Sequence, residues 1–217
     1  MTLGCWIEKP SAMLLKGLTA QYLLRRTFKV KEGHTILVHA AAGGVGLILC
    51  QWAKALGAHV IGTVGSPEKV KLAKKAGARD VIFYREEDFA ARVKEITKGR
   101  LCDVVYDGVG KTTFPASLDC LKPFGMFVSF GSASGPIEAF DLGLLSAKGS
   151  LYATRPSLHT YSAKPKHLAK MARELIDVVS SGKVTIDLHG TYALEDVANV
   201  HRALESRQTS GSIVLIP

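Results

Sequence analysis

The segment HTILVHAAAGGVGLILCQWAKALGA, residues 34–58, decides how the rest of the chain is interpreted. It opens with an apolar run over residues 35–39, whose length and composition predict a buried strand. Gly43 and Gly44 then lead into a second apolar stretch that ends near Gly57. The segment therefore predicts a strand, a tight glycine turn and a helix.

The spacing of the small residues in this turn is typical of dinucleotide-binding proteins. Ala41, Gly43 and Gly46 occupy the three positions of the G-x-G-x-x-G fingerprint, with alanine at the first. The first position keeps the turn tight, the second lets backbone N–H groups approach a pyrophosphate, and the third lets the helix pack closely on the strand. Because the first N–H groups of a helix lack intrahelical partners and the helix dipole is positive there, we expect the pyrophosphate at the start of this helix.

Length and composition are those of an ordinary globular protein. The chain has 217 residues, of which 47% are hydrophobic and 22% charged, enough for one domain or one and a fraction. Residues 35–53 carry no charged side chain, but adjacent glycines in their middle argue for a buried strand, turn and helix over a membrane span. No N-terminal segment has the pattern of a secretion signal, so we expect a cytoplasmic protein with no membrane attachment.

Cysteine usage and charge narrow the function classes further. The cysteines are widely spaced and form no C-x-x-C pair, which excludes a recognisable structural zinc site and fits reduced thiols. The net charge of +9 suggests a polyanionic partner such as nucleic acid. The lysines of residues 69–75 and 164–170, however, lie on segments with helical periodicity, where a solvated face explains them, and no aromatic interleaving accompanies them. Nucleic acid is therefore the disfavoured alternative.

Strand-like and helix-like segments alternate through the middle of the chain. Further strands are predicted at residues 59–64, 80–83, 103–106, 126–130 and 151–154, and further helices at 67–76, 88–97, 113–121 and 165–180. Strands separated by helices of this length require a parallel sheet covered on both faces. The fold class is therefore α/β: a doubly wound parallel sheet of the Rossmann type in three αβα layers, formed by residues 31–180.

The two ends of the chain do not obviously belong to that sheet. The first ten residues have no clear period, and residues 11–28 have the spacing of one or two helices. At the other end, residues 194–205 predict a helix and residues 212–216 a strand.

The tip of the second strand indicates which dinucleotide is bound. In a NAD site an acidic residue about twenty residues after the fingerprint accepts hydrogen bonds from the ribose hydroxyls. Here residues 62–66 contain no carboxylate, and Lys69 stands one turn into the next helix, where its ammonium can pair with a 2′-phosphate. We therefore predict NADPH over NADH, with FAD less favoured; the other interpretation of Lys69 is a surface lysine on a basic helix.

Several separated motifs match a known family in the same order. They are AAAGGVG, QWAKALGAHVIGTVGSPEK, YDGVG, SFGSASG, KGSLYATRPSL and ESRQTSGSIVLIP. Over residues 11–217 the chain closely resembles the NADPH:quinone oxidoreductases, the zeta-crystallin-like branch of the medium-chain dehydrogenase/reductases. The resemblance implies that residues 1–30 lead in from a GroES-like domain that we expect to be absent from this chain, and that residues 181–217 return toward it.

The resemblance also implies which residues contact the cofactor phosphates. These are Gly43, Gly44 and Val45 for the pyrophosphate, and Gly65, Lys69 and Tyr84 for the 2′-phosphate. Arg207, in ESRQTSGS, resembles a late arginine that reaches the same phosphates. Without the resemblance, Tyr84 is equally well an edge tyrosine of a strand, and Arg207 a solvated arginine.

On the nicotinamide side the resemblance implies Thr19, Phe130 and Gly131. Phe130 and Gly131 follow a strand, at the edge of the sheet where the ligands of such folds gather. The other interpretation of Thr19 is a helix hydroxyl that bonds to its own backbone.

Zinc chemistry has no support in the sequence. Zinc alcohol dehydrogenases place a ligating cysteine just before the cofactor domain, whereas residues 14–19, LLKGLT, offer neither thiolate nor imidazole. Tyr161 and Lys164 are one residue too close for the Tyr-x-x-x-Lys pair of short-chain dehydrogenases. His39 lies inside the first apolar strand and is interpreted as a core residue. No catalytic residue is assigned.

The resulting hypothesis is a zinc-independent oxidoreductase that moves hydride or electrons from NADPH to a quinone or a related activated alkene or carbonyl acceptor. The alternative is an NADPH-binding module without catalytic activity in this form. Family resemblance also implies a homodimer through the sheet edge near residues 137–154, which would cover an exposed edge.

Overall fold

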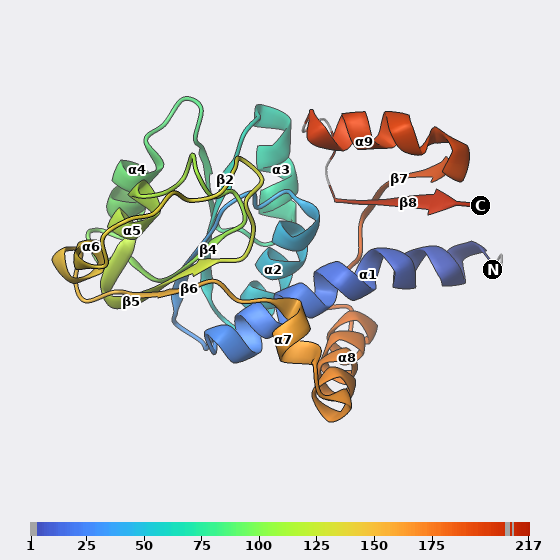
Figure 1. Cartoon of the computed structure of the whole chain (residues 1–217), viewed down its shortest axis with the longest axis horizontal. Helices are drawn as coiled ribbons and strands as arrows, with labels where there is room; N and C mark the ends of the chain where they lie inside the picture. Colours follow the sequence, from blue (N-terminus) through green and yellow to red (C-terminus); the bar gives the residue numbers. More distant parts are fainter. Residues whose placement is uncertain (1–3, 207–208, 210) are drawn as a thin grey trace.

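The central feature of the fold is a parallel sheet whose strand order is β3-β2-β1-β4-β5-β6 (Figure 1). This computed structural model describes residues 4–206, 209 and 211–217, with the backbone alone for residues 4–9. The strands of the sheet are β1 (Thr35–Val38), β2 (His59–Val64), β3 (Asp80–Phe83), β4 (Cys102–Asp107), β5 (Leu121–Ser129) and β6 (Tyr152–Thr154). All neighbouring pairs in the sheet are parallel, and the order reverses between β1 and β4.

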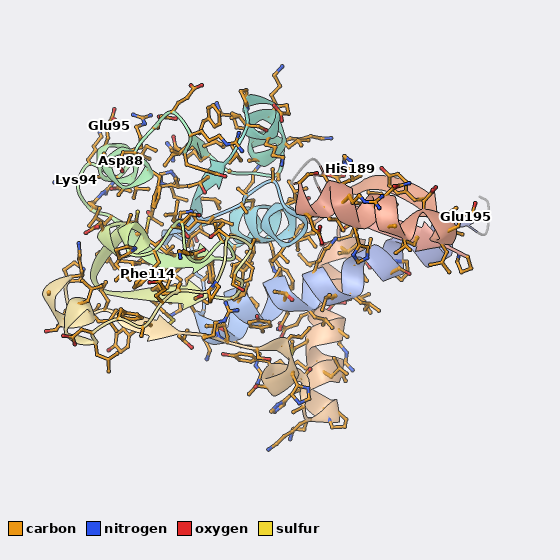
Figure 2. The ribbon with its side chains drawn as sticks, turned by 45° about the horizontal axis from the view of Figure 1, so that its top comes forward. Asp88, Lys94, Glu95, Phe114, His189 and Glu195 are labelled. Atoms are coloured by element: carbon orange, nitrogen blue, oxygen red, sulfur yellow. The ribbon has the colours of Figure 1, made fainter. Side chains whose placement is uncertain are left out.

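Helices connect the strands and cover the sheet on both faces. They are α1 (Gly4–Tyr22) with its π-helical continuation η1 (Leu23–Thr27), α2 (Gly44–Ala55), α3 (Pro67–Lys75), α4 (Phe89–Ile96), α5 (Ala116–Asp119), α6 (Gly143–Ala147), α7 (Leu158–Ser162), α8 (Pro165–Ser180), the 3₁₀ turn η2 (Leu194–Asp196) and α9 (Val197–Glu205). Asp88 lies at the start of α4 (Figure 2). Its carboxylate caps the helix by accepting hydrogen bonds from the N–H groups of Ala90 and Ala91.

Strand β1 shows why its sequence contains no polar side chain at its centre. Ile36 and Val38 pack with apolar residues of α1, α2 and α8 on one face, whereas Leu37 packs with those of α4 and α5 on the other. All three side chains are fully buried. Since both faces are covered, alternation of polar and apolar residues is lost, as is typical of parallel sheets. The predicted three-layer α/β fold is confirmed.

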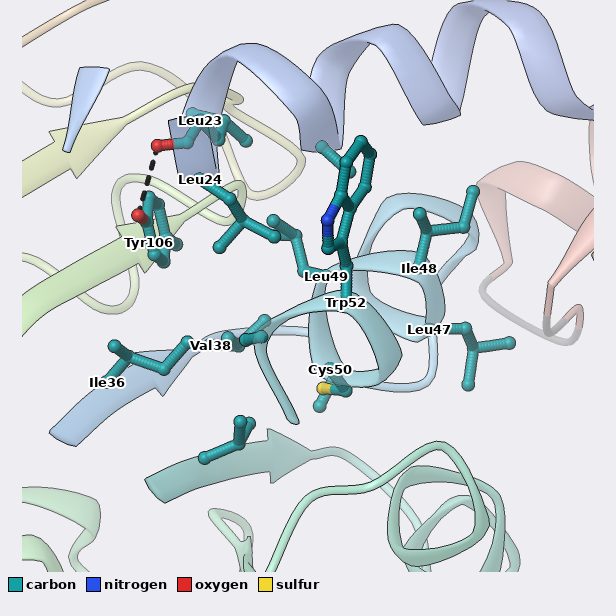
Figure 3. Close-up of a cluster of buried hydrophobic side chains, with 14 of the residues drawn as sticks. Leu23, Leu24, Ile36, Val38, Leu47, Ile48, Leu49, Cys50, Trp52 and Tyr106 are labelled. Atoms are coloured by element: carbon teal, nitrogen blue, oxygen red, sulfur yellow. Dashed lines mark hydrogen bonds between the residues drawn. The ribbon is translucent and has the colours of Figure 1, made fainter. Parts of the chain in front are cut away.

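The N-terminal helix begins earlier than the sequence pattern indicates. We predicted helix from residue 11, whereas α1 runs from Gly4 and passes into η1 without a break. The phenol of Tyr106 on β4 donates a 3.0 Å hydrogen bond to the Leu23 carbonyl oxygen, and Trp52 of α2 points toward α1 (Figure 3). These contacts hold the end of α1 against the sheet. Among the described residues, no helix is long and apolar enough to cross a membrane.

Outside the main sheet, β7 (Leu188–Ala193) and β8 (Ser212–Ile216) form a parallel pair of their own. The sequence predicted β8 but not β7, because Gly190 interrupts the apolar alternation. Gly211, just before β8, forms an isolated bridge with Gly43, so this C-terminal unit touches the glycine turn.

Two further boundaries differ from the predictions. The helix predicted over residues 113–121 is confined to Ala116–Asp119, and β5 begins at Leu121, five residues before the strand predicted over residues 126–130. The short helices α6 and α7 were not predicted, because segments of five residues give too little periodicity to recognise.

A buried polar network joins the carboxyl ends of β1, β2 and β4. The two ring nitrogens of His39 lie 2.9 Å from Thr63 Oγ1 and 3.0 Å from Ser117 Oγ. Ser117 and Thr113 in turn donate to Asp107 Oδ2, at 3.4 Å and 2.7 Å. His39 is 1% exposed, and burial lowers its pKa despite the nearby Asp107 carboxylate. The interpretation of His39 as a core residue with satisfied hydrogen bonds is confirmed.

The close packing of α2 on β1 gives a first prediction. A Cβ atom at Gly46 would lie 2.3 Å from the Ala40 carbonyl oxygen, a backbone atom that cannot move aside. We expect Gly46→Ala to lower the free energy of unfolding by about 1–3 kcal/mol, measured by urea denaturation. Gly143→Ala, whose Cβ would meet only Asp141 side-chain atoms at 3.3 Å or more, is the control and should change little. Equal stability of the two variants would contradict the packing argument.

The His39 network gives a second prediction, on pH. The pKa of His39 is lower in the folded state, so below about pH 6.5 the unfolded state binds the proton more readily and stability falls as the pH falls. The slope from one such group is at most about 1.4 kcal/mol per pH unit. We expect the unfolding free energy of the wild type to decrease more between pH 7 and pH 5.5 than that of His39→Gln.

The control for this measurement is His159→Gln, because His159 is exposed and outside the network. Its pH profile should parallel that of the wild type. If His39→Gln also parallels the wild type, the buried histidine does not carry the acid sensitivity.

Candidate functional site

The loops that follow β1, β2, β4 and β5 gather at one edge of the sheet, where the strand order reverses. In open α/β sheets ligands bind at this place, in the crevice outside the carboxyl ends of the strands. Most of the residues predicted to bind the cofactor lie in these loops.

The glycine turn presents unpaired backbone donors at the start of α2. Gly43 caps the helix in an extended conformation, with no side chain bonded to the helix N-terminus. The Gly43 N–H donates to the Ala40 carbonyl oxygen, and Gly44 faces the Gly211 carbonyl oxygen of the isolated bridge, whereas the N–H groups of Val45 and Gly46 meet no acceptor among the described residues. Free donors at a helix N-terminus form a ready anion site. A cofactor pyrophosphate fits this cradle.

The cradle has no space for a side chain at Gly44. A Cβ at Gly44 would lie 2.7 Å from Lys16 Cδ and 2.9 Å from the Gly211 carbonyl oxygen. Ala40, which starts the turn, has a φ of 52°, a conformation uncommon for residues other than glycine. The structure thus places predicted residues Gly43, Gly44 and Val45 together in one tight cradle.

Lys16 is a cation at this cradle that the sequence reasoning missed. Its Nζ donates a 2.9 Å hydrogen bond to Ser212 Oγ on β8, and partial burial lowers its pKa. It forms no ion pair with a carboxylate of the described residues. Its approach to Gly44 depends on how α1 crosses α2, which no local pattern reveals. The lysine adds positive charge beside the free N–H groups of α2.

The tips of β2 and β3 form a second part of the site. A Cβ at Gly65 would lie 2.6 Å from Tyr84 Oη, and the Tyr84 N–H donates to the Val64 carbonyl oxygen at 3.2 Å. Lys69 stands in the first turn of α3, whose start, Pro67, is two residues past Gly65. The predicted residues Gly65 and Tyr84 are therefore in contact, with Lys69 on the helix that follows.

The charges around this tip are more mixed than the sequence indicates. Ser66 Oγ donates to the Glu68 carboxylate, and this bond lowers the pKa of Glu68, with smaller contributions from Lys69 and Arg85. Glu68 is thus exposed and engaged by its neighbours, and Glu87, just past β3, accepts a 3.1 Å hydrogen bond from the Phe83 N–H. Arg85, next to Tyr84, is a further cation that the sequence reasoning did not single out.

On the other side of β1, the ends of β4 and β5 pack closely together. The Phe130 N–H donates to the Asp107 carbonyl oxygen at 2.8 Å, and a Cβ at Gly131 would lie 2.6 Å from the Gly108 carbonyl oxygen. Arg155 Nη1 donates to the Gly131 carbonyl oxygen at 2.7 Å and to both oxygens of Ser129 at 3.1 Å. Arg155, also missed from the sequence, fixes the loop that carries Phe130 and Gly131.

The remaining predicted residues are placed less directly. Thr19 Oγ1 donates a 2.8 Å hydrogen bond to the Leu15 carbonyl oxygen of its own helix, as the other interpretation of this residue supposed. Thr19 is half-buried and lies one helical turn beyond Lys16, on the same face of α1. Arg207 lies outside the described residues.

The donor set of a zinc site is not present in the part of the chain that the structure describes. No three side chains among its His, Cys, Asp and Glu residues come together as metal ligands. His189 and Glu195 lie at one end of the molecule, and Asp88 and Glu95 at the other (Figure 2). The residues present therefore do not fit a bound zinc ion.

Comparison with known proteins agrees with this arrangement. Residues 44–175 match the family described as zinc-binding dehydrogenase. The chain is 53% identical over 214 residues to a quinone oxidoreductase of Pseudomonas aeruginosa, covering 99% of this chain and 66% of the relative. It is 46% identical over 211 residues to a 2-haloacrylate reductase of a Burkholderia species, covering 95% of this chain and 62% of the relative.

A solved structure gives the same result. The crystal structure of Escherichia coli quinone oxidoreductase complexed with NADPH superposes with a TM-score of 0.94 at 52% identity, covering 97% of this chain and 65% of that one. The chain thus spans slightly less than two thirds of the length of these relatives. It belongs to the zinc-binding dehydrogenase family of the medium-chain dehydrogenase/reductase superfamily, and its close relatives there are quinone oxidoreductases.

Proposed function

We propose that this chain binds NADPH across the point where the strand order reverses, and that it forms the cofactor half of a zinc-independent oxidoreductase. The observation that carries the proposal is the cradle at the start of α2, where unpaired backbone N–H groups lie beside Lys16. Gly44 keeps this space open, because a Cβ at that position would meet Lys16 Cδ. The NADPH complex of a relative that is 52% identical supports the choice of cofactor.

Each part of the site has a separate task in this proposal. Gly43, Gly44 and Val45 hold the pyrophosphate through the backbone, with Lys16 beside them. Gly65, Lys69 and Tyr84 surround the 2′-phosphate. Arg85 adds a cation whose planar fork suits phosphate oxygens. These phosphate contacts fix the position of the cofactor, so the reacting end is oriented by groups distant from it.

At the reacting end, Phe130, Gly131 and Thr19 line the nicotinamide side, whereas Arg207 is proposed to reach the cofactor phosphates. Arg155 positions the loop of Phe130 and Gly131 through hydrogen bonds to its carbonyl oxygens. When bound, NADPH supplies the hydride, and the protein contributes binding, orientation and exclusion of water. No side chain is assigned as a proton donor.

The proposed acceptor is a quinone or a related activated alkene or carbonyl compound. The relatives named quinone oxidoreductase and 2-haloacrylate reductase support this class, since both names describe electron-poor conjugated acceptors. The alternative is a module that binds NADPH without turning it over.

The cofactor proposal predicts two kinds of variant. Lys69→Gln combined with Arg85→Gln removes cations near the 2′-phosphate only, so NADPH affinity should fall by about tenfold or more while NADH affinity changes little. Lys16→Met keeps the apolar stem but removes the charge near the pyrophosphate, so both cofactors should bind more weakly by a similar factor. Isothermal titration calorimetry measures the dissociation constants of NADPH and NADH for each of the two variants and for the wild type.

The matched control is Lys74→Gln combined with Lys75→Gln, at the far end of the same helix α3. It should leave both affinities unchanged. Tighter binding of NADH than of NADPH by the wild type would refute the assignment. Oxidation of NADPH with simple ortho- and para-quinones, followed at 340 nm, tests turnover, and binding without turnover would favour the non-catalytic alternative.

We also propose a homodimer through the edge of the sheet. β6 pairs with β5 on one side only, and Tyr152 on this strand is 58% exposed. Beside it a largely apolar cavity of about 630 Å³ is lined by residues that include Ile137, Phe140 and Leu142. An open strand edge next to exposed apolar side chains suits a two-fold contact with a second copy.

The dimer proposal predicts a mass of twice 23.3 kDa in sedimentation equilibrium. Tyr152→Lys combined with Leu142→Lys places like charges opposite each other across the two-fold axis and should give the monomer mass. Leu204→Lys, on α9 and 48% exposed, is the control and should remain dimeric. A monomeric wild type, or a dimer that survives the charged edge, would rule out this interface.

Two further parts of the proposal concern the ends of the chain and the compartment. We propose that residues 31–180 are the nucleotide-binding domain and that residues 1–30 and 181–217 lead to a GroES-like domain. The exposed apolar side chains of Leu15 on α1 and Leu194 on η2 support a covering partner there. The cysteines Cys102 and Cys120 are buried neighbours that remain free thiols, which supports the cytoplasm.

A further inference from the structure

A second concentration of positive charge lies at the opposite edge of the sheet from the glycine turn. A cavity of about 580 Å³ opens between η1, the connection that precedes β1, and α8, which lies beneath α1 in Figure 1. Its cationic lining residues are Arg25, Arg26, Lys29, Lys31 and Lys170, and His167 lies among them. The connection lies at the N-terminal end of β1 and the glycine turn at its C-terminal end. The two sites are therefore separated by the length of this strand, about 13 Å.

Arg26 is held in place on the wall of this cavity. Its Nη1 donates a 3.0 Å hydrogen bond to the Tyr161 carbonyl oxygen, and its guanidinium lies 5.1 Å from the centre of the Tyr161 ring. The Tyr161 ring is itself stacked on Tyr22 at 4.8 Å. The Nε and Nη2 donors of Arg26 have no partner among the described residues. A fixed arginine with free donors is prepared for phosphate or carboxylate oxygens.

Three further cations of the cavity are not neutralised by any of the described residues. Arg25, Lys29 and Lys31 are exposed, and their side chains form no ion pair or hydrogen bond among the described residues. The single lining carboxylate, Glu174, accepts a 2.8 Å hydrogen bond from Gln21 and lies 4.0 Å from Lys170. The surplus of positive charge also contributes, after burial, to the lowered pKa of His167.

Gln21 adds an unsatisfied acceptor to this wall. The residue is 1% exposed, its Nε2 donates to Glu174, and its Oε1 accepts no hydrogen bond. A ligand that carries hydroxyl donors beside its anionic groups suits the Glu174 carboxylate, which is partly exposed on this wall. The π-helical turn η1 supplies Arg25 and Arg26, and such turns occur frequently at functional sites.

We propose that this basic cavity binds a small phosphorylated molecule with hydroxyl groups, at a site separate from the nucleotide cradle. The volume lies within the range of small-molecule sites, about 300–1,000 Å³. A small ligand is favoured over nucleic acid, because the lining includes no exposed aromatic ring on which a base could stack. The inference does not depend on the proposed oxidoreductase activity.

Calorimetric titration with fructose 1,6-bisphosphate tests the proposal. Tripolyphosphate is the comparison probe, because it is also a phosphate polyanion but carries no alcohol hydroxyl groups. We expect saturable binding of the bisphosphate to one site, tighter than that of tripolyphosphate. The combined substitutions Arg25→Gln, Lys29→Gln and Lys170→Gln should weaken binding by at least about tenfold. Lys29→Glu alone should also weaken binding of the bisphosphate, and because Lys29 is exposed this substitution carries the least risk to folding.

The matched control removes the same charge elsewhere, with Lys71→Gln, Lys74→Gln and Lys75→Gln on α3, and should bind like the wild type. Circular dichroism confirms that each variant is folded. Repetition with saturating NADPH distinguishes the sites, and displacement of the bisphosphate by NADPH would overturn the proposal. Equal loss of binding in both triple variants would also overturn it, as would retention of RNA on a filter at concentrations where the bisphosphate does not bind.

Discussion

The contact between α2 and β1 at Gly46 is the constraint on which the rest of the structure depends. The Gly46 α-carbon packs so closely on the Ala40 and Ala41 backbone that no side chain fits between them. This approach brings the start of α2 to the end of β1, where its free N–H groups face the point at which the strand order reverses. A longer separation would move the donors away from the other strand ends. The same contact at Gly46 thus determines both the packing of α2 on β1 and the geometry of the anion cradle.

Much of this arrangement can be predicted from local sequence. The strand, glycine turn and helix of residues 34–58 each have a pattern with a physical cause, and the alternation that follows leads to the parallel sheet. The same reasoning predicts the cradle residues Gly43 to Val45, because they are adjacent in the chain. It also predicts the contact of Gly65 with Tyr84 in outline, since adjacent parallel strands end side by side.

Lys16 and Arg155, which sequence reasoning missed, both act across long separations in the chain. Lys16 reaches the cradle because α1 crosses α2, and Arg155 holds a loop 24 to 26 residues before it in the chain. Strand β7 escaped detection for a related reason, because its partner β8 lies beyond α9 and Gly190 weakens its local pattern. Such contacts follow from packing angles and crossings, which depend on the whole fold.

Helix α1 and its continuation η1 join the two proposed anion sites of the molecule. Lys16 stands at the cradle and Arg26 at the basic cavity, ten residues and about 15 Å further along the helix. Between them the Leu23 carbonyl oxygen accepts two hydrogen bonds, one of 3.2 Å from the Phe28 N–H that closes the π-helical turn and one of 3.0 Å from the Tyr106 phenol of β4. The helix is thereby fixed to Ser212 at one point, to the central sheet at the second and to Tyr161 at the third. Because these bonds already set the positions of both cations, each site is preorganised, and a ligand at either one loses little free energy to ordering the protein.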